Sequence, residues 1–296
     1  MRISFLSPLG AAWICWAIVG LSPIVGKYAI GVINPPLLVF LGSLIGSFIL
    51  LPAVLKQQEW GNILSASNRW KFLFIGTFGT ALPFTILLSA LHYTTPGNAA
   101  ILQQSELIYS LCFAMLFLKE SPSRKQLIGS LLVMLGSVLI LLKAPYTAQW
   151  KGDLMILGST WMLQAASTVA KKLPQGISPA AIGLARNLYA LPALGILLIC
   201  TYAGGNKAVF QPSFQLFAVI GYTGVLKYGL AMWVWYRAIR ALDLSKVTAI
   251  YLSYPAMTLL LSALLGLEKP SPAQVGGLLL SLYGGYLISR HIKNRG

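Results

Sequence analysis

Acidic residues are scarce in this chain. Only 6 of its 296 residues are Asp or Glu, against 22 Lys and Arg, and charged residues make up 9% of the sequence while hydrophobic residues make up 57%. A soluble domain carries about 25% charged residues. The shortage of charge therefore excludes an ordinary soluble fold and predicts an all-α integral membrane protein.

Residues that form metal sites and disulfides are also few. The chain has 2 histidines and 3 cysteines, and Cys15, Cys112 and Cys200 all lie inside apolar runs. In such runs a cysteine behaves as a small core residue. A membrane-embedded enzyme would need His, Asp or Cys clustered near one membrane face, and a channel would need a charged ring along its pore. We expect no catalytic site, no metal and no cofactor, and we keep a membrane-embedded enzyme as the alternative of another class.

Long apolar runs are what the chain does have. Ten of them are long enough to span a bilayer, and turn-forming pairs such as Ser178-Pro179 separate them. The first run has no small-residue cleavage site after it, so we interpret it as a retained span and not as a signal peptide. The predicted transmembrane helices are 8–26, 35–55, 70–91, 98–118, 124–143, 152–171, 179–202, 214–237, 244–265 and 272–290.

The Lys and Arg residues are distributed unequally over the loops. Fifteen fall on the side that holds both termini, five fall on the other side, and Arg186 and Lys227 lie within spans. Cytoplasmic loops carry the excess of Lys and Arg. We therefore predict a multi-pass protein of the cell (inner) membrane with both termini in the cytoplasm. The net charge of +16 is then a topology signal and not a sign of nucleic-acid binding.

The chain contains one stretch twice. Residues 120–140 recur at 268–288, where ten of 21 positions are identical at an offset of 148, half the chain length. A fixed offset without gaps indicates two copies of one unit, which we place at residues 1–148 and 149–296. Five spans per copy force the second copy to enter the membrane from the opposite side. Such inverted repeats are the architecture of alternating access.

The motif Glu-x-Pro-Ser stands before a Gly-rich fifth span in each half, at Glu120 and at Glu268. With ten spans in two five-span halves, the whole chain resembles the EamA-type exporters of the drug/metabolite transporter (DMT) superfamily. The resemblance implies a secondary transporter, expected here as a monomer, that exports amino acids or other small metabolites. The aromatic content is similar to that of the aromatic amino acid exporters, and multidrug or other metabolite efflux is the alternative. Glu120 and Glu268 themselves are expected in loop or capping roles.

Three ionisable residues lie inside predicted spans, where charge is costly and commonly functional. Glu106 shares a helix face with Gln103, and this polar face cannot point into lipid. A cavity-facing role and an interhelical bond are both open for Glu106. Lys227 takes the place of Gly79 of the first half, as a site residue or as a counter-ion. We interpret Arg186 mainly as structural, and we hypothesise that Glu106 and Lys227 approach each other in at least one transport state.

Aromatic residues complete the candidate site. Trp13 and Trp161 occupy equivalent positions of the two halves. Aromatic rings suit a small amphiphile with an aromatic or aliphatic side chain, although many membrane tryptophans are interfacial anchors. We expect a cavity near the bilayer midplane, lined by spans 1, 3, 4, 6, 8 and 9, with kinks at Pro23, Pro83 and Pro255. The candidate substrate-binding residues are Trp13, Trp16, Phe78, Gln103, Glu106, Trp161, Gln164, Lys227, Tyr251 and Tyr254.

Overall fold

The computed structural model describes residues 6–29, 32–94, 96–142, 149–204, 209–210, 212–266 and 269–290. Within these residues the only β element is an isolated antiparallel bridge between Ile33 and Phe210, so the all-α prediction is confirmed. Glu268 lies outside the described residues.

The helices of the first half are α1 (Pro8–Gly20), α2 (Ser22–Ala29), α3 (Pro35–Lys56), α4 (Trp60–Leu64), α5 (Ala66–Gly76), η1 (Thr77–Ala81), α6 (Leu82–Ala90), α7 (Pro96–Gln103), α8 (Ser105–Leu118) and α9 (Arg124–Leu141). Those of the second half are α10 (Trp150–Lys171), α11 (Pro179–Ala203), α12 (Phe214–Gly221), η2 (Tyr222–Ala231), α13 (Met232–Ala241), α14 (Leu244–Leu252), α15 (Tyr254–Leu264) and α16 (Pro272–Arg290).

Several long helices begin at a serine followed by proline. The Ser7 hydroxyl accepts a hydrogen bond from the Gly10 amide at 3.0 Å, and the Ser178 hydroxyl accepts one from the Ala181 amide at 3.2 Å. A serine at the cap satisfies an amide that the helix leaves free, and proline at the first helical position loses no hydrogen bond there. The same dipeptides that mark the turns in the sequence therefore fix where the spans start.

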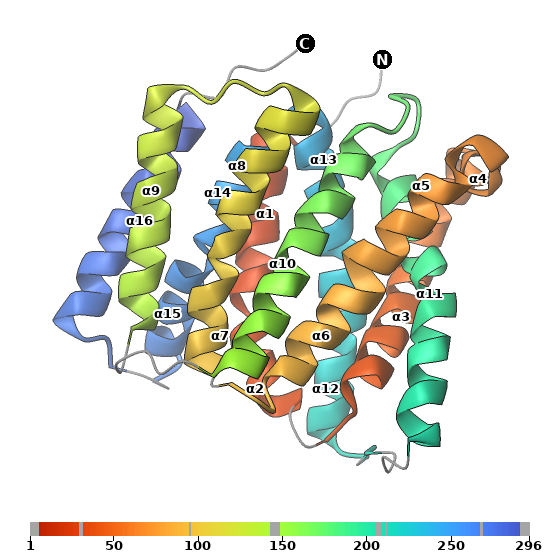
Figure 1. The fold of residues 1–296 in the computed structure, drawn as a ribbon, viewed down its shortest axis with the longest axis horizontal. Helices are drawn as coiled ribbons and strands as arrows, with labels where there is room; N and C mark the ends of the chain where they lie inside the picture. Colours follow the sequence, from red (N-terminus) through yellow and green to blue (C-terminus); the bar gives the residue numbers. More distant parts are fainter. Residues whose placement is uncertain are drawn as a thin grey trace.

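The helices form one bundle whose spans run up and down between two ends (Figure 1). The short helix α4 lies at one end, and α2 and α12 reach the other. We call these the α4 end and the α12 end. The predicted orientation places the α4 end in the cytoplasm, because it carries the loop that contains Lys56, Arg69 and Lys71.

Eight helical stretches of the described residues are long and apolar enough to cross a membrane: Pro8–Gly26, Pro35–Lys56, Ala66–Ala90, Ala99–Leu118, Arg124–Leu141, Pro179–Ala203, Phe214–Ala241 and Leu244–Leu264. The other two predicted spans are the helices α10 and α16, which have 22 and 19 residues. At about 1.5 Å per residue both approach the thickness of the hydrocarbon core. They are less apolar because α10 buries Ser159, Thr160 and Gln164 inside the bundle and α16 is rich in glycine.

The helix α9, which ends the first half, packs against α16, which ends the second half. A methyl group added at Gly136 would lie 2.6 Å from the Gly277 carbonyl oxygen, and one added at Gly284 would lie 2.6 Å from the Gly129 carbonyl oxygen. Gly129 and Gly277 are repeat equivalents, and so are Gly136 and Gly284. The contact is therefore antiparallel and reciprocal. Small residues allow this approach of two backbones in lipid, where hydrophobic burial between helices offers little.

Candidate functional site

The third span of each half contains a π-helical segment. η1 lies between α5 and α6 in the first half, and η2 lies between α12 and α13 in the second. The two segments are repeat equivalents, since Gly79 of η1 corresponds to Lys227 of η2 at the offset of 148. Single π-helical turns inside α-helices are frequent at functional sites.

The fourth span of each half is also interrupted. The first half breaks between α7 and α8 at Gln104, and the second breaks between α14 and α15 at Ser253. These breaks are equivalent, because Ser105 corresponds to Ser253. Discontinuous helices near the middle of a bundle typically form the binding sites of transporters with repeated halves.

Prolines account for three of the interruptions. Pro23 follows the break between α1 and α2, Pro83 follows η1, and Pro255 follows the break at Ser253. Proline lacks the amide hydrogen that would bond the carbonyl four residues earlier. For Pro83 that carbonyl belongs to Gly79, and it accepts a hydrogen bond from Arg186 instead.

Arg186 is held by acceptors from both halves of the chain. Besides the Gly79 carbonyl, its guanidinium donates to Thr80 Oγ1 at 2.7 Å and to Tyr236 Oη at 3.2 Å. The residue is 4% exposed. Its neighbour Asn187 donates from Nδ2 to the Tyr228 carbonyl of η2 at 3.0 Å. Two consecutive residues of α11 thus bind the irregular segments of both halves.

A central cavity of about 30 Å³ lies beside Arg186. On its wall, Glu106 accepts a hydrogen bond from Gln164 Nε2 at 2.6 Å, and Gln164 in turn accepts one from Thr248 at 3.4 Å. The six spans that the sequence singles out all contribute to the wall, and α11 adds Arg186. The lining residues are Cys15, Phe84, Glu106, Leu163, Ser167, Arg186, Met232, Trp235 and Tyr251.

A middle cavity of about 60 Å³ lies next to the central one and contains Lys227. The Lys227 Nζ atom lies 4.8 Å from the centroid of the Phe84 ring, and the Arg186 Cζ atom lies 5.9 Å from the same centroid. Phe84 lines both cavities. Its ring therefore lies at the boundary of the central and middle cavities, within reach of both cations.

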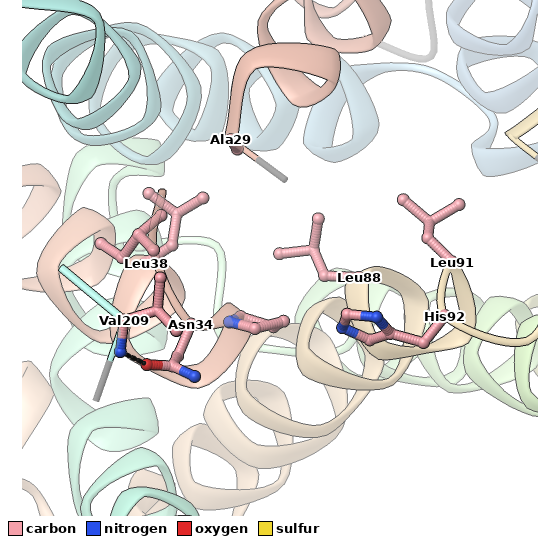
Figure 2. Close-up of a pocket in the computed structure, with 9 residues that line it drawn as sticks. Ala29, Asn34, Leu38, Leu88, Leu91, His92 and Val209 are labelled. Carbon is pink, nitrogen blue, oxygen red and sulfur yellow. Dashed lines mark hydrogen bonds between the residues drawn. The ribbon is translucent and has the colours of Figure 1, made fainter. Parts of the chain in front are cut away.

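An outer cavity of about 120 Å³ opens at the α12 end (Figure 2). Its wall includes Ala29, Leu38 and Leu88, which also line the middle cavity, and His92 stands beside Leu91 at its rim. The Asn34 side chain accepts a hydrogen bond from the Val209 amide at 2.6 Å and ties the two loops of this end together. The three cavities follow one another from the α12 end toward the middle of the bundle.

Polar contacts join the two halves at the α4 end. Lys171 Nζ lies 2.9 Å from Glu120 Oε1 and also donates to the Leu242 carbonyl. The same carboxylate accepts from the Leu244 amide at 2.9 Å and from the Ser245 hydroxyl at 3.2 Å. Glu120 therefore caps the start of α14, a capping role like the one the motif suggested.

Four of the ten candidate residues lie at the central and middle cavities or touch them. Glu106 and Tyr251 line the central cavity, Lys227 lines the middle one, and Gln164 bonds Glu106. Tyr254 is buried beside Tyr251, with ring centroids 6.2 Å apart. The hypothesised pair is not formed in this structure, because Glu106 bonds Gln164 and Lys227 faces Phe84.

The remaining candidates point elsewhere. Gln103 donates back to Ala99 of its own helix at 3.4 Å. Trp13 packs edge to face on Trp16 at 5.3 Å, and both rings turn toward α15 and α16. In the same way Phe78 and Trp161, with centroids 6.4 Å apart, belong to a group of rings on the outside of η1 and α10. None of these residues lines the central cavity.

Seven of the nine residues that line the central cavity were not among the candidates, and three of them, Arg186, Phe84 and Trp235, bear on its chemistry. Arg186 was interpreted mainly as structural, and Phe84 and Trp235 carry no signal beyond their aromatic character. The spacing of Pro83 and Gly79 gives the one usable clue, since it predicts a free carbonyl inside the third span. It does not say which side chain meets that carbonyl, because Arg186 is 107 residues away along the chain.

A bundle of apolar helices with interrupted spans, and with ionisable residues around cavities inside it, defines a multi-pass membrane transporter. Comparison with known proteins agrees. The profile of the EamA-like transporter family matches residues 8–142 and again residues 150–290, so the chain belongs to the EamA-like transporter family.

Individual relatives are distant. An uncharacterized transporter of Clostridium kluyveri is 22% identical over 264 residues, which are 87% of this chain and 84% of the relative. An uncharacterized transporter of Archaeoglobus fulgidus is 24% identical over 232 residues, 77% of this chain and 82% of the relative. A crystal structure of another protein superposes with a TM-score of 0.80 over 95% of each chain at 16% identity, which shows the shared fold alone.

Proposed function

We propose that this transporter exports amino acids with aromatic or other apolar side chains across the cytoplasmic membrane. The observation that carries the proposal is the pairing of charges around the central cavity. Glu106 offers a carboxylate to an ammonium group, and Arg186 offers a guanidinium to a carboxylate. Trp235 and Tyr251, with ring centroids 5.3 Å apart, line the same space and suit an apolar side chain.

The proposed mechanism is alternating access of two inverted five-helix repeats, residues 1–148 and 149–296. The two family matches, the equivalent interruptions of the third and fourth spans, and the reciprocal contact of α9 with α16 support it. The central cavity, at about 30 Å³, is far smaller than a cavity of about 150 Å³ that accommodates benzene. An amino acid therefore needs a wider state of the same cavity, as a transport cycle requires.

Efflux from liposomes tests the proposal. Purified protein is reconstituted, the vesicles are loaded with a broad panel of labelled amino acids, and efflux is measured with and without a proton gradient. We expect efflux of phenylalanine and other apolar amino acids above that of protein-free vesicles. Retention of every amino acid, with efflux of cationic drugs or other metabolites, would favour the multidrug or metabolite alternative.

The first variant to measure is Glu106→Gln, which keeps the shape and removes the charge. Because hydrogen bonds to charged groups contribute about 1.5–3 kcal/mol, efflux of zwitterionic amino acids should fall roughly 10- to 100-fold. The control is Glu59→Gln, whose carboxylate accepts a hydrogen bond from the Ser178 amide at 2.8 Å near the α4 end, away from the cavities. Equal efflux for both variants would remove Glu106 from the site.

A further inference from the structure

The acidic residues of the chain are nearly all committed at the ends of spans. Five of the six carboxylates lie in the described residues, and four of them have partners outside the cavities. The partners are the Ser178 amide for Glu59, Lys171 and the start of α14 for Glu120, Thr94 and the Gln149 amide for Asp153, and Lys246 for Asp243. Glu106 alone is left to balance the cations inside the bundle.

Two cations share the interior with that one carboxylate. Arg186 already donates to Gly79, Thr80 and Tyr236, so its charge is solvated by protein oxygens. Lys227 is different. No salt bridge or hydrogen bond of its ammonium group is formed within the described part of the chain, and the face of the Phe84 ring is the group it meets.

An ammonium group inside a bundle is costly without an anion or several oxygen acceptors. Two hydroxyls of the cavity wall are directed to backbone carbonyls and form no hydrogen bond with Lys227. Tyr222 Oη donates to the Ile18 carbonyl at 2.8 Å and accepts from Ser22, and Thr223 Oγ1 donates to the Val219 carbonyl at 2.7 Å. The cavity therefore presents a positive charge, in a small and mainly apolar space, that no carboxylate of the described residues neutralises.

We propose that the Lys227 cavity is a second subsite, which binds the carboxylate of the substrate on its way between the central cavity and the α12 end. This inference rests on the proposed function and adds an exit step to it. The substrate carboxylate leaves Arg186, passes the Phe84 ring that lines both cavities, and is held by Lys227 before release through the outer cavity. Substrates without a carboxylate gain nothing from this subsite.

A pair of probes of nearly equal shape tests the subsite. Phenylacetate carries a carboxylate, and phenylacetamide replaces it with a neutral amide. Either compound is added outside proteoliposomes that release labelled phenylalanine. We expect phenylacetate to inhibit efflux at least tenfold more strongly than phenylacetamide, and we expect Lys227→Met to abolish this difference while Lys227→Arg keeps it.

The matched control is Lys151→Met. Lys151 also lies over an aromatic face, 3.8 Å from the Tyr93 ring centroid, but it lines none of the three cavities. This variant should retain the full preference for phenylacetate. A loss of preference in Lys151→Met equal to that in Lys227→Met would reduce the effect to general surface charge and overturn the proposal.

A second measurement does not depend on transport. Phenylacetate should raise the Tm of the purified wild-type protein, since a ligand that binds the folded state stabilises it, and should leave the Tm of Lys227→Met unchanged. Lys227→Gln takes its place if the methionine variant aggregates. A wild type that moves no amino acid overturns the proposed function, whereas phenylalanine efflux with the preference intact in the Lys227 variants overturns only the subsite.

Discussion

At the scale of single residues, the site depends on a carbonyl that the chain leaves free. Pro83 removes the hydrogen bond to Gly79, and Arg186 replaces it from the other half of the molecule. Arginine suits this position because its planar group donates in several directions at once, which lysine does not do. The positive charge of the central cavity and the bend of the third span are therefore maintained by the same side chain.

Replacing Arg186 by lysine should destabilise the protein. At most part of its three hydrogen bonds survives, and buried acceptors left without a donor cost about 1–3 kcal/mol. Denaturant unfolding in mixed micelles measures the change. The control is Arg240→Lys, because Arg240 also donates to two carbonyls, those of Leu173 and Pro174, but at the edge of the bundle.

The control should lose less than about 1 kcal/mol, since water replaces the lost bonds at an accessible site. Equal losses of unfolding free energy in the two variants would mean that the buried hydrogen bonds of Arg186 stabilise the fold no more than the accessible ones of Arg240. Such a result would also weaken the assignment of the central cavity, because that cavity needs a fixed cation.

The sequence revealed the chemistry of this site better than its contacts. Glu106 and Lys227 are found directly, since charge inside an apolar span is rare. Trp13, Phe78 and Trp161 were chosen because they are aromatic, and the structure turns them toward other helices or the outside of the bundle. In a membrane the lipid face and the buried face of a helix are both apolar, so periodicity does not separate them.

At the scale of helices, the span limits were predictable and the interruptions were not. The predicted span 179–202 corresponds to α11 at Pro179–Ala203, and the last predicted span coincides with α16. Hydropathy and the Ser-Pro caps set these limits. The π-helical segment η2 contains no proline, so nothing in its sequence marks it as irregular. In the structure η2 packs against α3, and its Tyr228 carbonyl accepts a hydrogen bond from Asn187.

The contact of α9 with α16 gives a prediction at this scale. A methyl group at Gly277 would lie 2.7 Å from the Gly136 carbonyl oxygen, whereas one at the adjacent Gly276 would meet no atom within 4 Å. Gly277→Ala should therefore force the two helices apart and cost about 1–3 kcal/mol, the usual range for overpacking. Gly276→Ala should be neutral or stabilising by up to about 1 kcal/mol, since alanine is the better helix former.

Unfolding of the two variants, side by side, measures the difference. Both variants add the same methyl group at neighbouring residues of one helix. Differences in helix propensity and lipid exposure therefore contribute little to a large difference in their unfolding free energies. Equal stability would show that α9 and α16 separate without cost and do not form a fixed contact between the halves.

At the scale of the whole molecule, the cavities and the polar contacts lie at opposite ends. The three cavities lead inward from the α12 end, while Glu120, Lys171 and the start of α14 join the two halves at the α4 end. If the α4 end is cytoplasmic, as the Lys and Arg bias predicts, the structure represents a state that is closed toward the cytoplasm. Asn206, in the predicted outside loop between the spans 179–202 and 214–237, lies outside the described residues, so Leu88, which lines two cavities, is the better position for an accessibility label.

Accessibility of a cysteine at Leu88 tests both the orientation and the closure. The exposed residues Cys112 and Cys200 are first replaced by serine, and Cys15 is buried. In intact cells a membrane-impermeant maleimide should then label Leu88→Cys from outside. Labelling only after the membrane is opened would reverse the orientation and would place the α12 end in the cytoplasm.

Adding Glu120→Gln should slow that labelling. The substitution removes the ion pair with Lys171 and weakens the bonds to Leu244 and Ser245, all of which lie at the α4 end, the predicted cytoplasmic end. A loss of about 1.4 kcal/mol shifts the equilibrium tenfold toward the state open to the cytoplasm. If the two states are similarly populated, the fraction open to the outside falls from about one half to about one eleventh, so the labelling rate should fall about fivefold. Glu59→Gln, which weakens the cap of α11 without a salt bridge between the halves, should leave the rate unchanged. An unchanged rate in the Glu120 variant would mean that its cluster is a static cap and that closure of the cytoplasmic end depends on other contacts.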